Sequence, residues 1–291
     1  MDFRLTDDQR ALRDGTRELL ARIWPPGALR EPVDGARMRA LWRALGGAGV
    51  FALRLPEAAG GVGLGAAEAV LVFEEAGRVL LPGPLVATHL AAGVAAGAAT
   101  GERMVTRVDG GLVAWLAEAD EVTGEVRGAV ELRSVDPLTP LHRVPGRPAP
   151  YDPLAALLTA AEQLGSAART TETAVRHARG REQFGRPVGA FQAVKHRCAG
   201  MLVRAEIARA AVYAAAVTGD PVEIAGAKLL ADEAAVRNAR DCLQVHGGMG
   251  FTWESEVHLH LKRAWVRGRM RPTAEEAAEL QAETLGGAGA G

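Results

Sequence analysis

The sequence of 291 residues predicts a mainly α-helical protein with a small β-rich region in its middle. Apolar residues recur at helical spacing through the first third and the last half of the chain. Short β-prone pieces separated by turn formers occupy only residues 104–150, and they are too few and too short for a barrel or a sandwich. We therefore expect an N-terminal helical domain (1–103), a shortened middle β region (104–150), a C-terminal helical domain (151–285) and a flexible tail (286–291).

Four helices are expected in the N-terminal domain. Thr6 is a suitable N-cap for the first, because its hydroxyl can accept an N–H of the first turn, and Pro25 and Pro26 end that helix. Gly46 and Gly47 end the second. The expected helices are Asp7–Ile23, Ala36–Leu45, Ala66–Gly77 and Leu85–Ala99.

The stretch from Val79 to Gly101 carries no charged residue and is long enough to cross a bilayer. Pro82 and Pro84 interrupt its start, and much of the remainder is Ala and Gly, which insert weakly. We therefore predict a buried helix from Leu85 and no membrane span.

The C-terminal domain is predicted to be an antiparallel helical bundle. Its second helix has an apolar stripe whose spacing alternates between three and four, as in the seam of such a bundle. The stripe consists of Phe191, Val194, Cys198, Met201, Ala205, Ala208 and Val212. The expected helices are Leu154–Ala178, Ala190–Val217, Val222–His246 and Val257–Val266.

The 34 basic and 35 acidic residues leave a formal charge of −1. This balance argues against a nucleic-acid-binding protein, which needs surplus positive charge to neutralise phosphates. Cys198 and Cys242 fit neither a disulfide framework nor a Cys-x-x-Cys metal site, and the acidic first residues lack the apolar run of a signal peptide. A cytoplasmic protein is therefore expected.

Three histidines, His246, His258 and His260, could suggest a metal site. They lack an accompanying cluster of Cys, Asp or Glu at a known ligand spacing. We expect no metal, and we expect the three rings to be partly exposed near helix ends, where a positive imidazolium is favourable.

Two segments carry residue types suited to a nucleotide. Arg181–Pro187, followed by Phe191 and Gln192, joins two long helices and offers a guanidinium fork for phosphate oxygens. Gln244–Phe251 contains a glycine pair that permits close backbone approach to a ligand. Taken singly, each segment is better explained as an ordinary interhelix turn or helix C-cap.

Together, in this order and separation, the two segments resemble those of the acyl-CoA dehydrogenase family. Phe3–Arg13, Leu55–Gly65 and Val72–Arg78 are similar to that family as well, so the resemblance covers nearly the whole chain. It implies an acyl-CoA dehydrogenase-like fold with a helical N-terminal domain, a middle β domain, a C-terminal four-helix bundle and bound FAD.

In that family, residues of these two segments reach the nucleotide end of a neighbouring subunit's FAD. The resemblance, with the aromatic and amide side chains beside it, implies a set of cofactor-binding residues in this chain. The set is Arg181, Gln183, Phe184, Phe191, Gln192, Gln244, Gly247 and Gly248.

The family's catalytic carboxylate is missing at both places where it occurs. In the family a Glu removes the α-proton of an acyl-CoA while a β-hydride passes to the flavin. Its usual position matches Arg271, which stays protonated and cannot act as a base, and its alternative position matches Ala155. The Arg that helps bind the acyl-CoA matches Ala156. We therefore predict no catalytic residue in this chain.

The resemblance then implies a subunit that completes a partner's active site. Bacterial enzymes of this family that shorten steroid side chains are α₂β₂ heterotetramers of two different chains. This chain is expected to be the subunit without the base, acting with FAD on an acyl-CoA such as a steroid side-chain CoA ester, with an electron-transfer flavoprotein or similar acceptor. Two alternatives stay open: a scaffold that binds no FAD, and a lyase on the same fold using Asp152 or Glu162.

Overall fold

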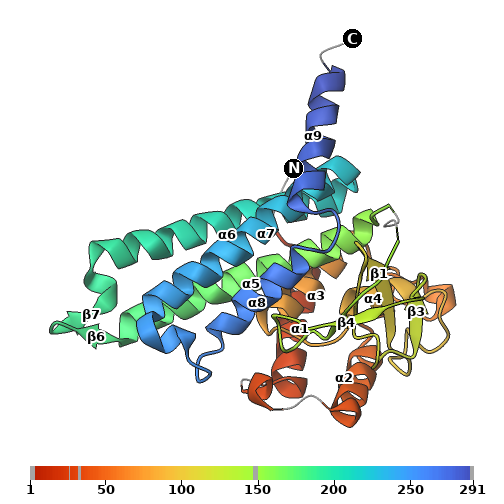
Figure 1. Cartoon of the computed structure of the whole chain (residues 1–291), viewed down its shortest axis with the longest axis horizontal. Helices are drawn as coiled ribbons and strands as arrows, with labels where there is room; N and C mark the ends of the chain where they lie inside the picture. The colour runs from red at the N-terminus through yellow and green to blue at the C-terminus, as the bar shows by residue number, and fades with distance from the viewer. Residues whose placement is uncertain (1–3, 26, 32–33, 147–149, 289–291) are drawn as a thin grey trace.

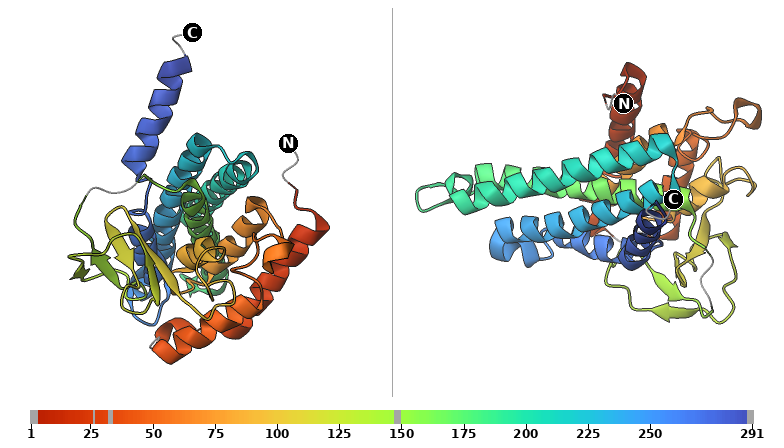
Figure 2. Two further views of the ribbon diagram at one scale, coloured as in Figure 1. Left: turned by 90° about the vertical axis from the view of Figure 1, so that its right-hand side faces the viewer. Right: turned by 90° about the horizontal axis from the view of Figure 1, so that it is seen from above.

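The computed structural model describes residues 4–25, 27–31, 34–146 and 150–288 (Figure 1). Helices of the N-terminal part pack directly on a long C-terminal bundle, and a small sheet lies beside both (Figures 1 and 2). The helices are α1 Asp7–Ile23, α2 Gly35–Gly47, α3 Ala66–Arg78, α4 Leu85–Ala91, α5 Pro153–Gly180, α6 Gln192–Thr218, α7 Pro221–His246, α8 Val257–Arg267 and α9 Ala274–Ala288. The strands are β1 Val105–Asp109, β2 Leu112–Ala114, β3 Glu121–Thr123, β4 Val130–Leu132, β5 Leu141–Arg143, β6 Glu182–Gln183 and β7 Arg186–Pro187.

The N-terminal helices follow the prediction except for the last one. Thr6 and Gln9 form a reciprocal capping box at the start of α1, with bonds of 3.1 and 3.2 Å. The fourth helix ends at Ala91 and not at Ala99 as expected: beyond it the backbone forms turns, with the Ala92 N–H bonded to the His89 carbonyl oxygen and the Val94 N–H to that of Ala91. None of the described helices is long and apolar enough to cross a membrane.

The middle region forms one small sheet with the strand order β3-β1-β2-β5-β4. Only the β1–β3 pair is parallel. A tight hairpin joins β1 to β2 through Gly110 and Gly111, which have φ values of +59° and +76°. Val105 and Val113 are fully buried, so one face of the sheet belongs to the core. The prediction of a small sheet is confirmed, although the sequence pattern indicated only the strands now seen as β2 and β4.

Helix α5 connects the N-terminal helices to the bundle. It packs against α3 on one side and against α6 and α7 on the other (Figures 1 and 2). The α3–α5 crossing depends on two glycines, because a Cβ on Gly77 would lie 2.0 Å from the Glu162 carbonyl oxygen and one on Gly165 would lie 1.9 Å from the Glu74 carbonyl oxygen. The two parts of the chain are therefore held in close backbone contact.

Helix α6 buries the inner part of the predicted apolar stripe. Met201, Ala205, Ala208 and Val212 are each no more than 2% exposed. The helical bundle predicted for this part of the chain is thus confirmed.

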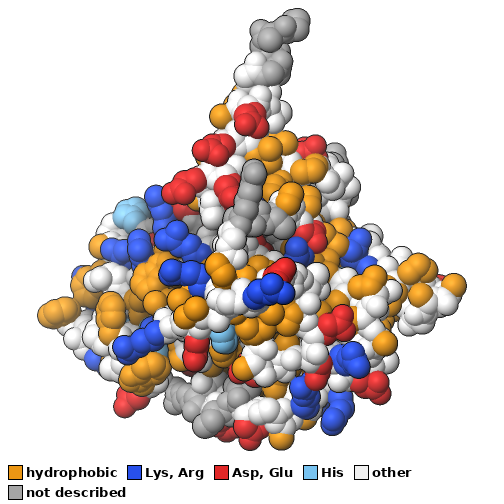
Figure 3. Space-filling model, turned by 45° about the vertical axis from the view of Figure 1, so that its right-hand side comes forward, with side chains coloured by type: hydrophobic (Ala, Val, Ile, Leu, Met, Phe, Trp, Pro, Cys, Tyr) orange, Lys and Arg blue, Asp and Glu red, His pale blue; other side chains and the backbone are white. Residues whose placement is uncertain are grey.

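Helix α9 was not predicted. It projects from the bundle, and Figure 3 shows acidic side chains along it (Figures 1 and 3). Its apolar side consists mostly of alanines, and Ala277 is its only residue in the buried core among those described. It extends to Ala288, so the first three residues of the expected tail are helical, while 289–291 lie outside the described residues.

The expected partial exposure of the helix-end histidines is wrong for His258 and His260. They are 8% and 6% exposed, because α8 packs against both α5 and α7. His260 Nδ1 lies 2.7 Å from Ser166 Oγ. Burial lowers the pKa of His260 to about 3, so the ring is neutral at physiological pH.

Candidate functional site: the bundle tip and the internal cavity

The first predicted nucleotide segment forms an exposed turn at one end of the bundle, between α5 and α6 (Figure 1). Arg181 is the C-cap of α5, and its carbonyl oxygen accepts the N–H of Val188 at 2.7 Å. Strands β6 and β7 pair antiparallel and make the turn rigid. Among the described residues, the Arg181 guanidinium has no hydrogen-bond or ion-pair partner. It is therefore a cation open to a ligand.

Phe184 is held outward from this turn in a strained conformation. Its side chain is 91% exposed, and its φ is +56°, which is unusual for a bulky residue. Its ring meets Phe191 edge to face with centroids 6.1 Å apart, and the Arg186 guanidinium lies 4.4 Å from the Phe191 ring centroid. Nothing in the hydrophobic core of the chain accounts for this ring, which fits contact with another surface.

The second predicted segment lies beside the first. His177, in the last turn of α5, stacks on His246, the last residue of α7, with ring centroids 4.0 Å apart. The Nδ1–H of His246 donates to the Cys242 carbonyl oxygen at 2.8 Å. The structure therefore brings Arg181 and Gly247 to the same end of the bundle.

The glycine pair after α7 is open to the outside. Gly247 has φ +61° and ψ −143°, a conformation essentially restricted to glycine. Gly248 has an ordinary φ, and a Cβ added to it would meet no atom within 4 Å. By contrast, a Cβ on Gly250 would lie 2.9 Å from the Leu243 carbonyl oxygen. The chain's own packing thus explains Gly250 but not Gly248, whose bare backbone faces solvent.

The three predicted glutamines are exposed on the same end. Gln183 bonds the Glu182 carbonyl oxygen at 2.9 Å, and Gln192 lies 3.0 Å from His196. The residues at this tip fit the nucleotide end of FAD, because they combine a free cation for the diphosphate, an exposed ring, amides and accessible glycine backbone. We call this set of eight residues the bundle tip: Arg181, Gln183, Phe184, Phe191, Gln192, Gln244, Gly247 and Gly248.

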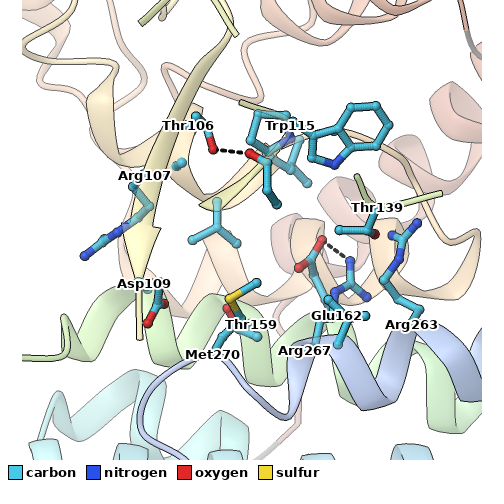
Figure 4. Close-up of a pocket in the computed structure, with 18 residues that line it drawn as sticks. Thr106, Arg107, Asp109, Trp115, Thr139, Thr159, Glu162, Arg263, Arg267 and Met270 are labelled. Atoms are coloured by element: carbon cyan, nitrogen blue, oxygen red, sulfur yellow. Dashed lines mark hydrogen bonds and ion pairs between the residues drawn. The ribbon is translucent and has the colours of Figure 1, made fainter. Parts of the chain in front are cut away.

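A separate cavity of about 100 Å³ lies between the start of α4, the sheet, α5 and α8 (Figure 4). Ala155, at the start of α5, lines it and is 3% exposed. Arg271 follows α8, and its side chain bonds Glu276 of α9 at 2.6 and 2.8 Å. The two residues that the sequence predicted at the positions of the family's base are therefore an apolar methyl group and a cation bonded to Glu276.

The arginines that line this internal cavity are each paired with a carboxylate, although Arg267 Nη1 and Arg107 Nε are buried without a hydrogen-bond partner. Glu162 and Arg267 form an ion pair of 2.6 Å, and both side chains are at least nine-tenths buried (Figure 4). Arg263 pairs with the fully buried Asp136 and donates to the Leu81 carbonyl oxygen at 3.1 Å. Burial raises the pKa of Glu162 and lowers that of Arg267 to about 10. Glu162 is therefore engaged by a cation, and it is not a free base.

Sequence reasoning missed Asp109 as a cavity residue. It is in β1, accepts the Arg271 N–H at 2.9 Å and lines the cavity. Burial raises its pKa. The sequence offered no clear signal for it, because β1 reads Val-Thr-Arg-Val-Asp without alternation and was not predicted as a strand.

Two family descriptions match the chain: "Acyl-CoA dehydrogenase, N-terminal domain" over residues 6–103 and "Acyl-CoA dehydrogenase, C-terminal domain" over residues 154–286. The acyl-CoA dehydrogenase IpdE2 of Mycobacterium tuberculosis is 35% identical over 89% of this chain and 91% of its own length. The acyl-CoA dehydrogenase FadE34 of the same organism is 34% identical, but this chain spans only 45% of its length.

Solved structures of similar fold include one chain of the ChsE4-ChsE5 complex from Mycobacterium tuberculosis. It has a TM-score of 0.80 and 24% identity, covering 98% of this chain and 99% of that one. A Tcur3481-Tcur3483 steroid ACAD variant has a TM-score of 0.78 and 24% identity, covering 96% and 99%. At this identity the structures establish the fold. With the IpdE2 match across nearly both full lengths, they lead to one conclusion: this chain belongs to the acyl-CoA dehydrogenase family.

Proposed function

We propose that this chain is the subunit of a heteromeric, flavin-dependent acyl-CoA dehydrogenase that lacks the catalytic base and completes the FAD site of a base-bearing partner. One observation carries the proposal. The bundle tip combines an unpaired Arg181, an exposed ring and open glycine backbone that suit a nucleotide, while the positions matched by resemblance to the family's carboxylate are Ala155 and Arg271.

The side chains of the bundle tip suggest which part of the reaction each subunit would perform. FAD, when bound, accepts the β-hydride of the acyl-CoA, and a carboxylate of the partner takes the α-proton. In this chain Arg181 would bind the diphosphate, and Phe184 would cover the adenine. Gln244 would bond a polar edge of the nucleotide, and Gly247 and Gly248 would allow the backbone to approach it. This chain binds and orients, and it moves no proton.

The relatives support the heteromeric part of the proposal. One similar structure is a complex of two named chains, ChsE4 and ChsE5, and another is described as a steroid ACAD. We extend these descriptions to this chain as an α₂β₂ assembly acting on a steroid side-chain CoA ester, with an electron-transfer flavoprotein or similar acceptor. A cytoplasmic location is part of the same proposal.

Co-expression with a base-bearing homologue tests the proposal. The purified pair should carry FAD and oxidise an acyl-CoA with an artificial electron acceptor, whereas this chain alone should be inactive. A pair that forms but holds no flavin would support the scaffold alternative and contradict the proposal.

Arg181→Ala provides the residue-level test. Loss of a charge-assisted contact should weaken FAD binding by about tenfold to a hundredfold, because such contacts contribute roughly 1.5–3 kcal/mol. Arg179→Ala is the matched control, since Arg179 is an exposed cation of the same last turn that is not in the bundle tip. Equal flavin content in the Arg181→Ala and Arg179→Ala proteins would show that Arg181 does not bind FAD.

A further inference from the structure

Helix α6 carries apolar side chains on two opposite sides. One side packs on α3, α5 and α7 and contains Met201, Ala205 and Val212, each no more than 2% exposed. Because successive residues of a helix are rotated by about 100°, the opposite side holds a second apolar row, which we call the outer stripe. In Figure 1 α6 lies along the margin of the bundle, and this row faces away from it. The outer stripe consists of Ala199, Val203, Ile207, Ala210, Ala214 and Val217.

Four large apolar side chains on or beside the outer stripe are exposed in the single chain. Val203, Ile207 and Val217 are 56%, 51% and 62% exposed, and Leu202 is 53% exposed. Single exposed apolar residues are ordinary on a protein surface, but a continuous row of them marks an interaction surface. A helix that is apolar on both sides is typically buried on both sides. We therefore expect another surface to cover the outer stripe.

Helix α7 shows how the same bundle treats a face that meets water. Apart from Pro221 and Leu230, its exposed positions all carry charged or amide side chains, namely Glu223, Glu233, Arg237, Arg240 and Gln244. On α6, between residues 199 and 217, the one charged side chain at an exposed position is Glu206, and it is paired with Arg209. The two helices are neighbours of nearly equal length, so their outer faces are suited to different surroundings.

The spacing of the outer stripe fits a second helix. Its six positions are separated by four, four, three, four and three residues, close to the alternation of a seam between packed helices. Three of the six are alanines, whose small side chains let two helix axes approach closely. The stripe is about 27 Å long at 1.5 Å per residue. A helix lying along α6 would cover all of it.

The charges at the two ends of α6 are opposite in sign. Lys195, four residues before the outer stripe, is exposed and forms no ion pair with a described residue. Beyond the other end lie the exposed carboxylates of Asp220 and Glu223, which likewise form no ion pair with a described residue. Glu223 accepts the Thr218 hydroxyl at 2.7 Å, so its carboxylate lies beside the last turn of α6. The outer stripe therefore runs from a positive end to a negative end.

A second copy of α6, antiparallel to the first, matches both the stripe and the charges. Lys195 precedes Ile207 by 12 residues, and Asp220 follows it by 13. A two-fold axis near Ile207 therefore brings each lysine to the acidic turn of the other copy. The midpoint of the outer stripe, at residue 208, falls at the same place. In a parallel arrangement the two lysines would meet each other, and so would the carboxylates.

We propose that two copies of this chain associate through their outer stripes, with the two α6 helices antiparallel. Burial of Leu202, Val203 and Ile207 from both copies drives the association. The Lys195 side chain of each copy faces Asp220 and Glu223 of the other, and these charges select the antiparallel direction. The contact does not depend on the proposed flavin site. In a heteromer it joins two copies of this chain.

Sedimentation equilibrium of the full chain alone tests the association. We expect a dimer that dissociates on dilution. Val203→Glu places a charge in the apolar seam and should weaken dimerisation by about a hundredfold or more. Val94→Glu is the matched control, because Val94 is an 88% exposed valine in the turns after α4. It should leave the dissociation constant within about twofold.

Charge exchange tests the direction of the two helices. Lys195→Glu should weaken the dimer by about threefold to tenfold, because it removes two attractive contacts per dimer and adds repulsion. Lys195→Glu/Glu223→Lys should recover most of that loss. A double variant that dimerises no better than Lys195→Glu would contradict the antiparallel arrangement.

Engineered thiols test the register. With Cys198 replaced by serine and Cys242 left buried, Ile207→Cys should form an intermolecular disulfide under mild oxidation, because both copies of this residue lie near the axis. Ala199→Cys is the control and should not, since its two copies are roughly 24 Å apart along the helices.

Three outcomes overturn the proposal. The first is a chain that stays monomeric at about 100 μM, which would leave the outer stripe to a different protein, such as a base-bearing partner. The second is an equal effect of Val203→Glu and Val94→Glu on the dimer. The third is a disulfide that forms as readily through Ala199→Cys as through Ile207→Cys. If Val203→Glu does not fold, the charge exchange and the thiols decide.

Discussion

At the bundle tip the Arg181 guanidinium bonds no described residue, whereas in the internal cavity Arg263 and Arg267 each pair with a buried carboxylate. Phe184 is exposed and strained at the tip, while Trp115 in the cavity wall is only 5% exposed. The tip therefore has exposed groups without partners, whereas in the cavity the buried charges are held in ion pairs, with Arg107 Nε and Arg267 Nη1 left without a hydrogen-bond partner. This contrast is the one expected of a chain that binds a cofactor held by a partner and has lost its own chemistry.

The largest expected effect comes from breaking the pair inside the cavity. Glu162→Ala leaves Arg267 buried without a counter-charge, which should lower the free energy of unfolding by about 3–5 kcal/mol. The double variant Glu162→Leu/Arg267→Met should recover most of that loss, because no unpaired charge remains. Urea unfolding of the three proteins measures both. A loss below about 1 kcal/mol in Glu162→Ala would show that the cavity is open to water.

The next effect concerns acid stability and His260. Its folded pKa, about 3, lies below the unfolded value of about 6.5, so the unfolded state binds the extra proton between these pH values. The contribution of His260 to the free energy of unfolding is fully present above pH 6.5. It is lost as the pH falls toward 3, by up to about 1.4 kcal/mol per pH unit.

His260→Gln should therefore flatten the pH dependence of the unfolding free energy in this window. His196→Gln, at an exposed position of α6, is the control and should retain the wild-type slope. Parallel slopes for wild type and His260→Gln would contradict a neutral, buried His260.

At the bundle tip, one substitution should weaken the binding of FAD without lowering the free energy of unfolding. Phe184→Gly removes a strained φ of +56° and an exposed ring, so the unfolding free energy should not fall. FAD binding by the co-purified pair should weaken by about tenfold, since stacking of a base on an aromatic ring contributes roughly 1–3 kcal/mol. Fluorescence titration of FAD and urea unfolding give the two quantities. A less stable protein with unchanged FAD affinity would reverse the interpretation of Phe184.

The smallest expected change in stability distinguishes two glycines. Gly248→Ala should alter the unfolding free energy by less than about 0.5 kcal/mol, because the new methyl group meets nothing in the chain. Gly250→Ala should cost more, since its methyl group would approach the Leu243 carbonyl oxygen. If Gly248→Ala also leaves FAD binding of the pair unchanged, no ligand approaches that backbone.

The success of the sequence predictions depended on how local the signal was. The caps and breaks around α1, the stripe of α6 and the Asp220–Pro221 start of α7 are determined by neighbouring residues, and these helices lie where expected. The second half of the Leu85–Ala99 helix was wrong, because a run rich in Ala and Gly does not show where a helix gives way to consecutive turns. Strands β1, β3 and β5 were not predicted. Each has only three to five residues, and such short segments form strands only when they pair with a neighbouring strand.

The sequence alone determined the helical class and the resemblance to the family, because each is a property of residue type at a position; the absence of a base at Arg271 and Ala155 stays a prediction. Only the tertiary structure decided which charges meet. Glu162 and Arg267 are 105 positions apart, and Arg17 and Glu75 are 58 apart, so no periodicity along the chain relates them. Their proximity follows from the packing of α1, α3, α5 and α8, in which close backbone crossings place side chains from distant segments in one low-dielectric space.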